Sequence, residues 1–565
     1  WRDLGSLPVR TNGIKAVAAV SLPELTVFIS HSIYGVYYIQ PDQKSPSWTS
    51  LNAGLERLET TDNPDEVSDI AAAPGRASSL PEVYVSQTFR QRLYRLDWTR
   101  KRFVPILAEG GGFGPIDSLA VGEETIRFVR EGAIMELGRP GGLAPVPLTG
   151  RRRDDIAAWL SIPARLGLKS DCAAVWGNGF FLDTGPVILS ELWLLDESPR
   201  ARGAAFGREG LYLPVDHALE SATLQPYLDM MAERNLDMAV IDMKDDYGRL
   251  RFTPENPAVS GKGRVFRPVD IDAFLKTMKE RGVYTAARIV VFKDPELAGK
   301  EGEKYAVWDS RTGRAWQGYY DTRRQKLPAG QRAEPSSGSA LTEVFPASDP
   351  AYEILRTYYD ERWVDPYSEE VWEYIAQTAA ELHRRGFDEI QFDYIRFPTD
   401  GDNLGNALYR WRDSGMDMES AMLSFLRHVR SRIEAPLSID IYGANGWYRT
   451  GARTGQEVEL LAHYVDVISP MYYPSHFEQD FLAQDPPELR PYRIYYLGTR
   501  RTQVIARGRI IVRPYVQAFF LNVAYDRRYY NVDYVFQEVK GVREAGGAGL
   551  TYWNNSGRYD DIPVP

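Results

Sequence analysis

Hydrophobic and polar residues follow two different periodic patterns along the chain, and the pattern changes near residue 203. Before it, short alternating runs predict strands and turns with few helical periods. After it, strand patterns alternate with helical patterns. The change predicts an all-β domain over residues 1–202 and a strand-and-helix domain over residues 203–565.

Pairs of strand-like segments that resemble hairpins recur in the first domain at intervals of roughly 40 to 55 residues, which is typical of the blades of a β-propeller. The pairs are 27–30 with 35–38, 83–86 with 93–96, 126–129 with 134–137, and 180–182 with 192–195. Gly35–Tyr38 followed by Trp48–Leu51 resembles propeller repeats of the sialidase type, and a β-sandwich is the alternative. The glycine run at 110–114 predicts a turn rather than a phosphate loop, since no lysine or helix pattern follows it. We expect this domain to pack beside the second one, with glycan binding as the alternative.

The second domain contains eight strand patterns with intervening helical patterns. The strands are predicted at 211–215, 238–245, 283–292, 386–398, 437–443, 465–473, 510–517 and 549–554. Helices are predicted near 224–235, 270–282, 369–385, 419–434 and 534–543. This order predicts a (β/α)8 barrel. A long insertion at about 298–362 carries Trp308, Trp316, Tyr319 and Tyr320, and we expect it to wall the cleft.

The fourth strand pattern carries the most informative acid. Ile390 and Phe392 alternate with Gln391 and Asp393, so one face of the strand is polar. Barrel enzymes place their chemistry at the carboxyl ends of the strands, where Asp393 stands. Asp440 occupies the matching place on the fifth strand.

Composition excludes several classes of function. A net charge of -10 and a pI near 5.4 argue against nucleic acid as a partner. No apolar run reaches the length of a membrane span. Cys172 is the single cysteine, and the six histidines show no ligand spacing, so we expect no metal. No dinucleotide fingerprint or nucleophile elbow occurs, so we expect no cofactor.

Four motifs together resemble one known family. They are Ala287–Pro295, Trp363–Tyr367, Glu389–Pro398 and Ile468–His476. They are similar to the bacterial putative glycosyl hydrolase domain family, which is distantly related to α-amylase-type barrels. The resemblance covers about residues 210–555. It implies a glycosidase-like TIM barrel acting on a carbohydrate polymer or oligosaccharide, without implying which sugar.

The resemblance also implies roles for two acids. Glycoside hydrolysis uses two carboxyl groups, one as proton donor and the other as nucleophile or base. Amylase-type barrels carry the nucleophile on strand four and the acid on strand five, which gives Asp393 and Asp440. Because those enzymes carry Glu on strand five, Asp242, Asp245 or an acid of the insertion stays open as the second carboxylate. The structural alternatives are an ion pair of Asp393 with Arg396 or Arg288, and a hydrogen bond from a tyrosine to Asp440.

Other polar and aromatic residues near strand ends are candidates for contacts to sugar rings and hydroxyls. They are Asp242, Lys244, Asp245, Arg288, Gln391, Arg396, Tyr442, Tyr472, Tyr473, His476, Gln517 and Trp553. We expect Arg288 to orient the strand-four carboxylate, and Lys244 to lower the pKa of neighbouring acids.

The predicted function is that of a glycosidase that cleaves a polysaccharide, α-linked and from within the chain. The alternative is a non-catalytic carbohydrate-binding or cell-envelope protein on the same scaffold. The chain begins at Trp1 rather than a methionine. We therefore expect a removed leader and a secreted, periplasmic or envelope-associated bacterial protein. The sequence leaves the oligomeric state open.

Overall fold

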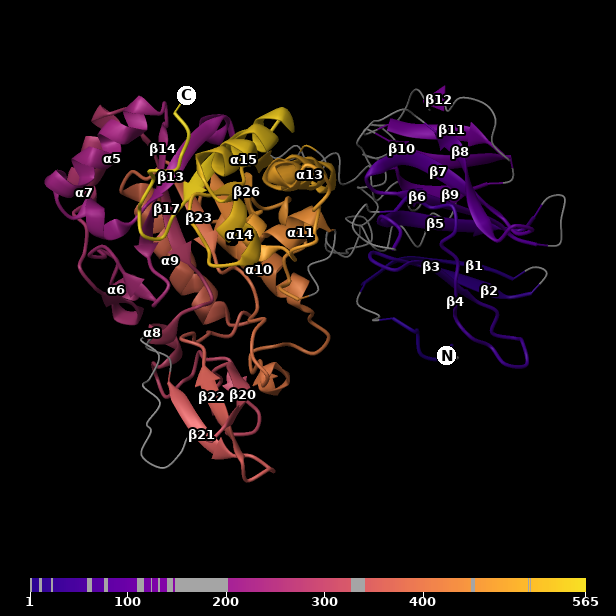
Figure 1. The fold of residues 1–565 in the computed structure, drawn as a ribbon, viewed down its shortest axis with the longest axis horizontal. Helices are drawn as coiled ribbons and strands as arrows, with labels where there is room; N and C mark the ends of the chain where they lie inside the picture. Colours follow the sequence, from indigo (N-terminus) through magenta and orange to yellow (C-terminus); the bar gives the residue numbers. More distant parts are fainter. Residues whose placement is uncertain are drawn as a thin grey trace, which may run out of the picture.

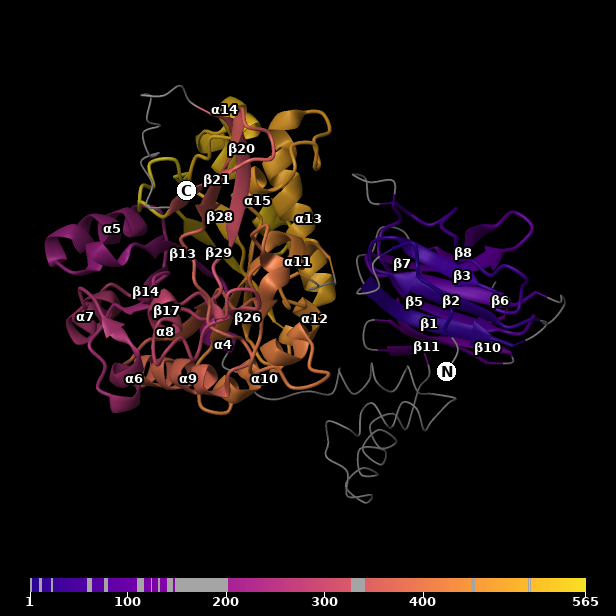
Figure 2. The same ribbon diagram turned by 90° about the horizontal axis from the view of Figure 1, so that it is seen from below.

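The computed structural model describes residues 3–9, 13–21, 24–57, 63–75, 80–108, 116–122, 124–130, 133–139, 146–147, 202–326, 341–448, 453–506, 508 and 510–564. These residues form two bodies: antiparallel sheets from the N-terminal part and a strand-and-helix barrel from the C-terminal part (Figures 1 and 2). None of the helices in these ranges combines the length and apolarity that a membrane span requires.

The described part of residues 3–147 forms three antiparallel sheets, each of four strands consecutive in the chain. The first contains β1 (Ile14–Val20), β2 (Thr26–His31), β3 (Gly35–Ile39) and β4 (Thr49–Ser50). The second contains β5 (Val67–Ala73), β6 (Glu82–Gln87), β7 (Arg90–Asp97) and β8 (Arg102–Ala108). The third contains β9 (Ile116–Val121), β10 (Thr125–Arg130), β11 (Ala133–Gly138) and β12 (Val146–Pro147).

The first three predicted hairpins are confirmed as the antiparallel pairs β2–β3, β6–β7 and β10–β11. The first strands of the sheets also meet, since β5 contacts both β1 and β9. The fourth predicted pair, 180–182 with 192–195, and the glycine run at 110–114 lie outside the described residues. The propeller interpretation therefore stays a prediction.

Among the described residues, eight parallel strands close into a barrel because β13 pairs with both β14 and β29. The strands are β13 (Arg208–Leu213), β14 (Met238–Lys244), β17 (Tyr284–Val290), β23 (Glu389–Asp393), β25 (Leu437–Tyr442), β26 (Val467–Met471), β27 with β28 (Ile511–Val512 and Tyr515–Gln517) and β29 (Gly549–Trp553). They follow one another around the barrel in chain order. The predicted barrel and its eight strands are confirmed.

Helices alternate with these strands. They are α4 (Arg202–Ala205), α5 (Ser221–Glu233), α6 (Pro257–Lys262), α7 (Ile271–Glu280), α8 (Pro295–Ala298), α9 (Glu369–Arg384), α10 (Met418–Arg430), α11 (Gly443–Trp447), α12 (Val458–Leu461), α13 (Arg490–Ile505), α14 (Ala524–Tyr529) and α15 (Val532–Glu544). Asp270 caps α7, since its side chain accepts a hydrogen bond from the Ala273 amide. Helix α13 was not predicted because its arginine- and tyrosine-rich sequence shows no clean apolar period, although Ile494 and Tyr495 are buried.

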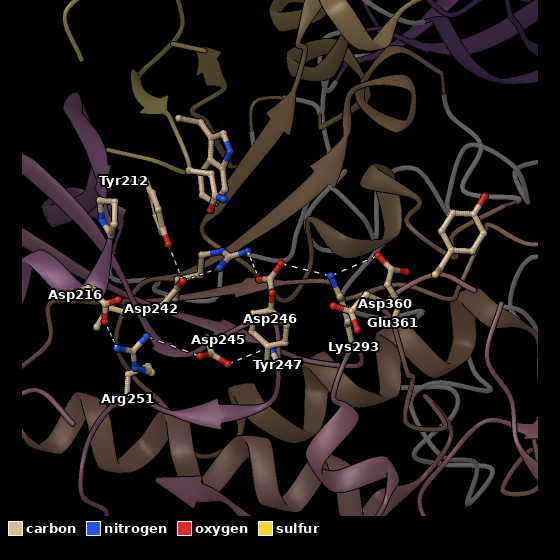
Figure 3. A pocket seen from close by; sticks show the side chains of 16 residues that line it. Tyr212, Asp216, Asp242, Asp245, Asp246, Tyr247, Arg251, Lys293, Asp360 and Glu361 are labelled. Atoms are coloured by element: carbon tan, nitrogen blue, oxygen red, sulfur yellow. Dashed lines mark hydrogen bonds and ion pairs between the residues drawn. The ribbon is translucent and has the colours of Figure 1, made fainter. Parts of the chain in front are cut away.

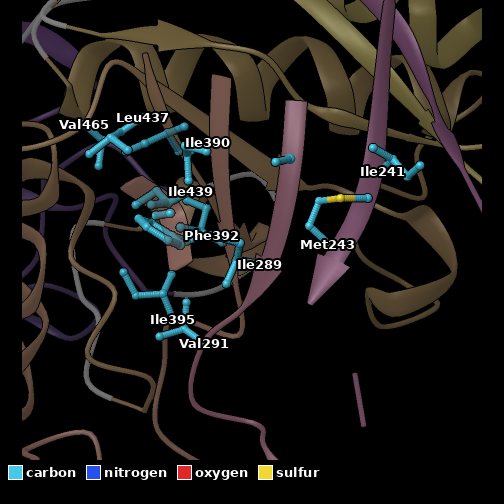
Figure 4. Close-up of a cluster of buried hydrophobic side chains, with 14 of the residues drawn as sticks. Ile241, Met243, Ile289, Val291, Ile390, Phe392, Ile395, Leu437, Ile439 and Val465 are labelled. Atoms are coloured by element: carbon cyan, nitrogen blue, oxygen red, sulfur yellow. The ribbon is translucent and has the colours of Figure 1, made fainter. Parts of the chain in front are cut away.

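Alternate side chains of the barrel strands point outward and form the main core with the helices. Figure 4 shows Ile390 and Phe392 of β23 beside Ile439 of β25 in this layer. Burying one such side chain contributes about 1.5–3 kcal/mol. A second apolar cluster, which includes Met238 and Ala286, lies among the inward positions and also takes in Ala205 of α4. The inward positions nearer the carboxyl ends of the strands are polar.

The insertion after β17 contributes two small sheets. One joins β18 (Trp308–Asp309), β19 (Arg314–Ala315) and β24 (Ala407–Leu408). The other joins β20 (Tyr319–Gln325), β22 (Tyr352–Tyr358) and β21 (Thr342–Pro346), and it projects from the barrel in Figure 1. The buried Trp316 indole donates to the Asn403 carbonyl at 3.1 Å, so the insertion is fixed to the loop that follows β23.

Arg501 of α13 connects the N-terminal sheets to the barrel. Its guanidinium donates to both carboxylate oxygens of Asp65, at 3.0 and 3.2 Å, and lies 3.5 Å from the ring centroid of Phe89. It also donates to the Trp447 carbonyl at 2.8 Å. Arg501 and Asp65 are both buried, so this ion pair lies inside the contact between the two bodies.

Candidate active site

Strand β23 ends at Asp393, whose side chain is held by three hydrogen bonds. Arg288 of β17 donates to Asp393 Oδ2 from Nε at 3.1 Å and from Nη2 at 2.5 Å. The Tyr394 amide donates to Asp393 Oδ1 at 2.6 Å. Tyr394 has a φ of +49°, a conformation that costs a non-glycine residue free energy and that is found at functional sites. The predicted pairing of Asp393 is therefore with Arg288 and not with Arg396.

Arg288 is the centre of a cluster of carboxylates. Its Nη1 donates to Asp242 Oδ1 of β14 at 2.5 Å, and its Nη2 donates to Asp246 Oδ1 at 3.2 Å. Tyr212 of β13 donates to Asp242 Oδ2 at 2.8 Å (Figure 3). The guanidinium also lies 5.2 Å from the ring centroid of Trp553 at the end of β29. One arginine thus connects three acids and an aromatic ring from β14 and the turn after it, β23 and β29.

Asp440 of β25 lies beside Asp393, because β23 and β25 pair in parallel with Phe392 opposite Ile439. It is 1% exposed, and its Oδ1 has no hydrogen-bond partner among the described residues. Burial and the neighbouring Asp393 charge raise the pKa of Asp440 well above its usual range. Burial therefore favours the protonated form of Asp440, which lies next to an ion-paired carboxylate.

The pKa values of two acids around Arg288 are shifted in opposite directions. Burial raises the pKa of Asp242 even though Arg288 opposes the change. Burial also acts to raise the pKa of Asp246, but Arg288 and Lys293 outweigh it and lower that pKa. Acid–base sites are recognised by such divergence of neighbouring pKa values.

A cavity of about 470 Å³ opens over Arg288, Asp242 and Asp246, a size typical of small-molecule sites. Asp393 and Asp440 are not among its lining residues. The barrel contributes Tyr212, Asp242, Arg288 and Trp553 to its wall. The end of the insertion contributes Tyr359, Asp360 and Glu361. Glu361 pairs with Lys293 at 3.4 Å, and Lys293 pairs in turn with Asp246 at 3.5 Å (Figure 3). The prediction that the insertion walls the cleft is confirmed.

Several predicted binding residues meet at this end of the barrel. Asp242, Asp245, Arg288 and Trp553 line the cavity. Tyr473 lies close enough to Asp440 and Asp393 that their charges, after burial, raise its pKa. Gln391 lies one inward position below Asp393, where its Oε1 accepts a bond from Tyr515 at 2.6 Å.

Lys244 and Tyr472 do not line the cavity. The pairing register shifts between Asp242 and Lys244, and the buried lysine bonds to Asp294 at 2.9 Å and to the Val290 carbonyl at 2.6 Å. The Tyr472 hydroxyl donates to the Gly498 carbonyl at 2.8 Å, against α13. Both residues therefore have structural contacts instead of the predicted role at the cavity.

Four other candidates are occupied by protein contacts. Gln517 accepts bonds from Ser475 and donates to Asp526, which joins the turn after β26 to α14. The Arg396 guanidinium donates to the Phe397 carbonyl and stacks on the Tyr442 ring at 4.8 Å. His476 packs beside Tyr473, with ring centroids 5.2 Å apart, and burial lowers its pKa.

Four residues of the site were missed by the sequence predictions: Tyr212, Asp246, Lys293 and Tyr515. Glu361 is an acid of the insertion, which the sequence left open only as a group. Tyr212 and Tyr515 stand at inward strand positions, so alternation offered a signal for both. Asp246 and Glu361 lie beyond strand ends, where alternation no longer applies. No group of three or more His, Cys, Asp or Glu in the described ranges is arranged to hold a metal ion.

Comparisons with known proteins place the barrel in a family. Residues 210–559 match the family model described as putative glycosyl hydrolase domain. None of the curated proteins compared matches the chain.

Solved structures give only distant likenesses. A hypothetical protein from Ruminiclostridium thermocellum is 27% identical over 41% of this chain and 97% of its own, with a TM-score of 0.31. An α-galactosidase from Thermus thermophilus is 12% identical over 95% of each chain, with a TM-score of 0.38. Trehalose-6-phosphate hydrolase from Bacillus licheniformis is 12% identical over 61% of this chain and 64% of its own, with a TM-score of 0.34. These scores lie below 0.5, and no conclusion about function rests on them.

The family match covers the whole barrel. It begins within β13 and ends beyond β29, so it includes the acid cluster at the carboxyl ends of the strands and the insertion that walls the cavity. It also includes all four motifs found in the sequence, and it spans more than half of the 565 residues. The barrel is a glycoside hydrolase-like scaffold, and the chain belongs to the putative glycosyl hydrolase domain family.

Proposed function

We propose that the protein is a glycosidase whose carboxyl pair is Asp393 and Asp440. The observation that supports this is the contrast between two neighbouring acids at matching places on adjacent strands. Asp393 accepts three hydrogen bonds, two of them from a cationic guanidinium. Asp440 has an unpartnered buried oxygen and a raised pKa. Glycoside hydrolysis needs one ionised and one protonated carboxyl group at the scissile bond.

The roles follow from these states. Asp440 donates its proton to the leaving glycosidic oxygen as the bond to the anomeric carbon breaks. Asp393, held by Arg288, attacks that carbon and forms a covalent glycosyl ester. Asp440, now ionised, takes a proton from water, whose oxygen attacks the same carbon and releases the sugar and Asp393. The side chains of Asp393 and Arg288 are 12% and 2% exposed, so the sugar at the cleavage point must reach the depth of Arg288.

The finer features of the function are also proposals. We propose an α-linked polysaccharide substrate, cleavage from within the chain, and a site of action outside the cytoplasm. The open, insertion-walled cavity supports a substrate that extends beyond one sugar unit. Asp242, Asp245 and Glu361 line the cavity and remain alternatives to Asp440 as the second carboxylate.

The Asp393→Asn variant tests the proposal. The change keeps the shape of the side chain and removes the nucleophile, so we expect hydrolysis of a panel of polysaccharides to fall by at least about 10³-fold. Arg288 retains Asp242 and Asp246, so the variant should fold. Asp229→Asn on the exposed face of α5 is the matched control and should keep full activity. Reducing-end release and circular dichroism are the measurements.

A non-catalytic carbohydrate-binding protein is the rival function. It predicts that parent and Asp393→Asn bind a glycan of the panel equally and that neither releases reducing ends. That result, or turnover that survives in Asp393→Asn, would contradict the proposed glycosidase.

A further inference from the structure

The projecting sheet β20–β22–β21 has two unlike faces. On one face the Arg356 guanidinium lies 3.6 Å from the ring centroid of Tyr319 and 4.8 Å from that of Phe345. The same guanidinium makes two hydrogen bonds of 2.8 Å to Asp321. The aromatic rings and charges of this face are therefore occupied by one another.

The opposite face presents different chemistry to solvent. Strand register places Tyr320 opposite Thr357, and Thr322 opposite Leu355, with Val344 on the other side of Leu355. Tyr320 is 41% exposed and Val344 is 54% exposed. We call these five residues the Tyr320 face. It offers one aromatic ring, three hydroxyl groups and aliphatic side chains, a combination that suits the C–H faces and hydroxyl groups of sugars.

The Tyr320 face continues into the cavity. Tyr359, which follows β22, lines the cavity, and its ring centroid lies 5.6 Å from that of Tyr320. The next two residues, Asp360 and Glu361, line the cavity as well. A ligand leaving the cavity along Tyr359 therefore meets the Tyr320 ring next.

The base of the sheet is fixed relative to the proposed catalytic strand. The loop after β23 contains Asp402, whose Oδ2 accepts a bond from the Asp321 amide at 2.8 Å. In the same loop, Asn403 Nδ2 donates to the Gln317 carbonyl at 3.0 Å. The loop thus joins the carboxyl end of β23 to the start of β20, and a surface held in this way is pre-organised for binding.

We propose that the Tyr320 face binds sugar units of a glycan chain that extends out of the cavity past Tyr359. The inference rests on the proposed function and deepens it, because it names the surface that selects a polymer over a short glycoside. Tyr320 stacks on one sugar ring, and Thr322 and Thr357 bond to its hydroxyl groups. A chain held both in the cavity and on the sheet is cleaved from within.

Binding to a protein that cannot cleave separates this inference from the proposed function. The probes are soluble starch, dextran, galactomannan and chitosan, each cast into native gels at a series of concentrations and run with the Asp393→Asn protein. We expect at least one of them to retard it. Adding Tyr320→Ala should raise the apparent Kd about fivefold to tenfold, the usual value of one stacking contact. The increase should be larger for the polymer than for its disaccharide unit.

Phe345→Ala is the matched control, because Phe345 is an exposed aromatic residue on the opposite face of the same sheet. It should leave the Kd unchanged. Equal effects of Tyr320→Ala and Phe345→Ala would overturn the inference, as would the absence of retardation by all four probes. A change from dimer to monomer on Tyr320→Ala in size-exclusion chromatography would also overturn it, since the face would then bind a second copy. Hydrolysis by the parent decides the proposed function independently.

Discussion

Strand β23 directs two acids into the barrel, and each meets an arginine at a different depth. The lower acid, Glu389, pairs with Arg513, and both side chains are fully buried. Tyr284 adds a hydrogen bond to Glu389 at 3.1 Å. The pair has one negative and one positive charge and lies next to the apolar cluster that contains Tyr284. It is a balanced pair in a closed environment.

The upper acid, Asp393, belongs to a different kind of group. Arg288 is shared among Asp393, Asp242 and Asp246, and Asp440 adds a fourth carboxyl group next to them. These acids outnumber the cations even with Lys293 included. We call Arg288 and its four neighbouring acids the upper layer, and the cavity reaches it at Arg288, Asp242 and Asp246. The excess of acidic groups is accommodated by shifts in the pKa values of some of these acids. A balanced ion pair needs no such shift. The comparison separates an ion pair that serves stability from one that we propose takes part in the chemistry.

The lower pair should give the largest effect on stability. In the Glu389→Gln variant, Arg513 becomes a buried charge without a counterion, and we expect a loss of about 3–5 kcal/mol in the free energy of unfolding. Asp393→Asn should cost less, since Arg288 keeps two carboxylates. Urea denaturation of both variants checks the comparison.

The double variant Glu389→Gln with Arg513→Met is the control. Removing the second charge should recover most of the lost stability, because an apolar replacement of a buried pair is often neutral. If Asp393→Asn destabilised the protein as much as Glu389→Gln does, the distinction between the two layers would fail.

Much of the upper layer was predictable because strand alternation and strand ends are visible in the sequence. Asp393 and Asp440 each occupy an inward position near the carboxyl end of a strand, and the structure places them side by side. Tyr473 follows the inward sequence Val467, Ser469, Met471, whereas Tyr472 points outward to α13. Hydrophobicity alone does not separate two adjacent tyrosines, so both were predicted as ligands.

The remainder depends on geometry that local patterns do not encode. The register shift after Asp242 turns Lys244 away from the acids toward Asp294. Glu361 reaches the cavity only because the insertion returns to the barrel, where the Val364 amide bonds to the Phe292 carbonyl. The lower pair joins residues 124 positions apart, and no motif connects them.

The second prediction concerns Asp440, the acid without a cation of its own. The Asp440→Asn variant loses the proton donor, and we expect kcat to fall about 10²- to 10³-fold. In the parent, activity should fall as pH rises through the raised pKa of Asp440, because the donor is then ionised. The pH–rate profile of the Asp440→Asn variant should lack this decrease at high pH. Rates from pH 4 to pH 9 on a responsive polysaccharide test both points.

Stability provides a control that does not need a substrate. Below about pH 4 the folded and unfolded states both keep the Asp440 proton. Above it the unfolded chain releases the proton while the folded chain keeps it, so the free energy of unfolding falls as pH rises toward the folded pKa. The parent should lose up to about 1.4 kcal/mol per pH unit relative to Asp440→Asn. If the difference in free energy of unfolding between the parent and Asp440→Asn did not change with pH, the raised pKa of Asp440 would be contradicted.

The smallest effect is expected at Trp553, an aromatic residue that lines the cavity beside Arg288. Its ring lies 4.2 Å from Tyr212 and 5.2 Å from the Arg288 guanidinium, and it lines the cavity. Trp553→Ala removes a stacking surface worth about 1 kcal/mol, so KM should rise about fivefold while kcat changes less. Trp553→Phe should recover part of the loss. Trp411→Ala, which changes an exposed tryptophan away from this cavity, is the control and should leave KM unchanged. If Trp553→Ala left KM unchanged as well, the aromatic wall would be structural, and the open layer would be defined by its charges alone.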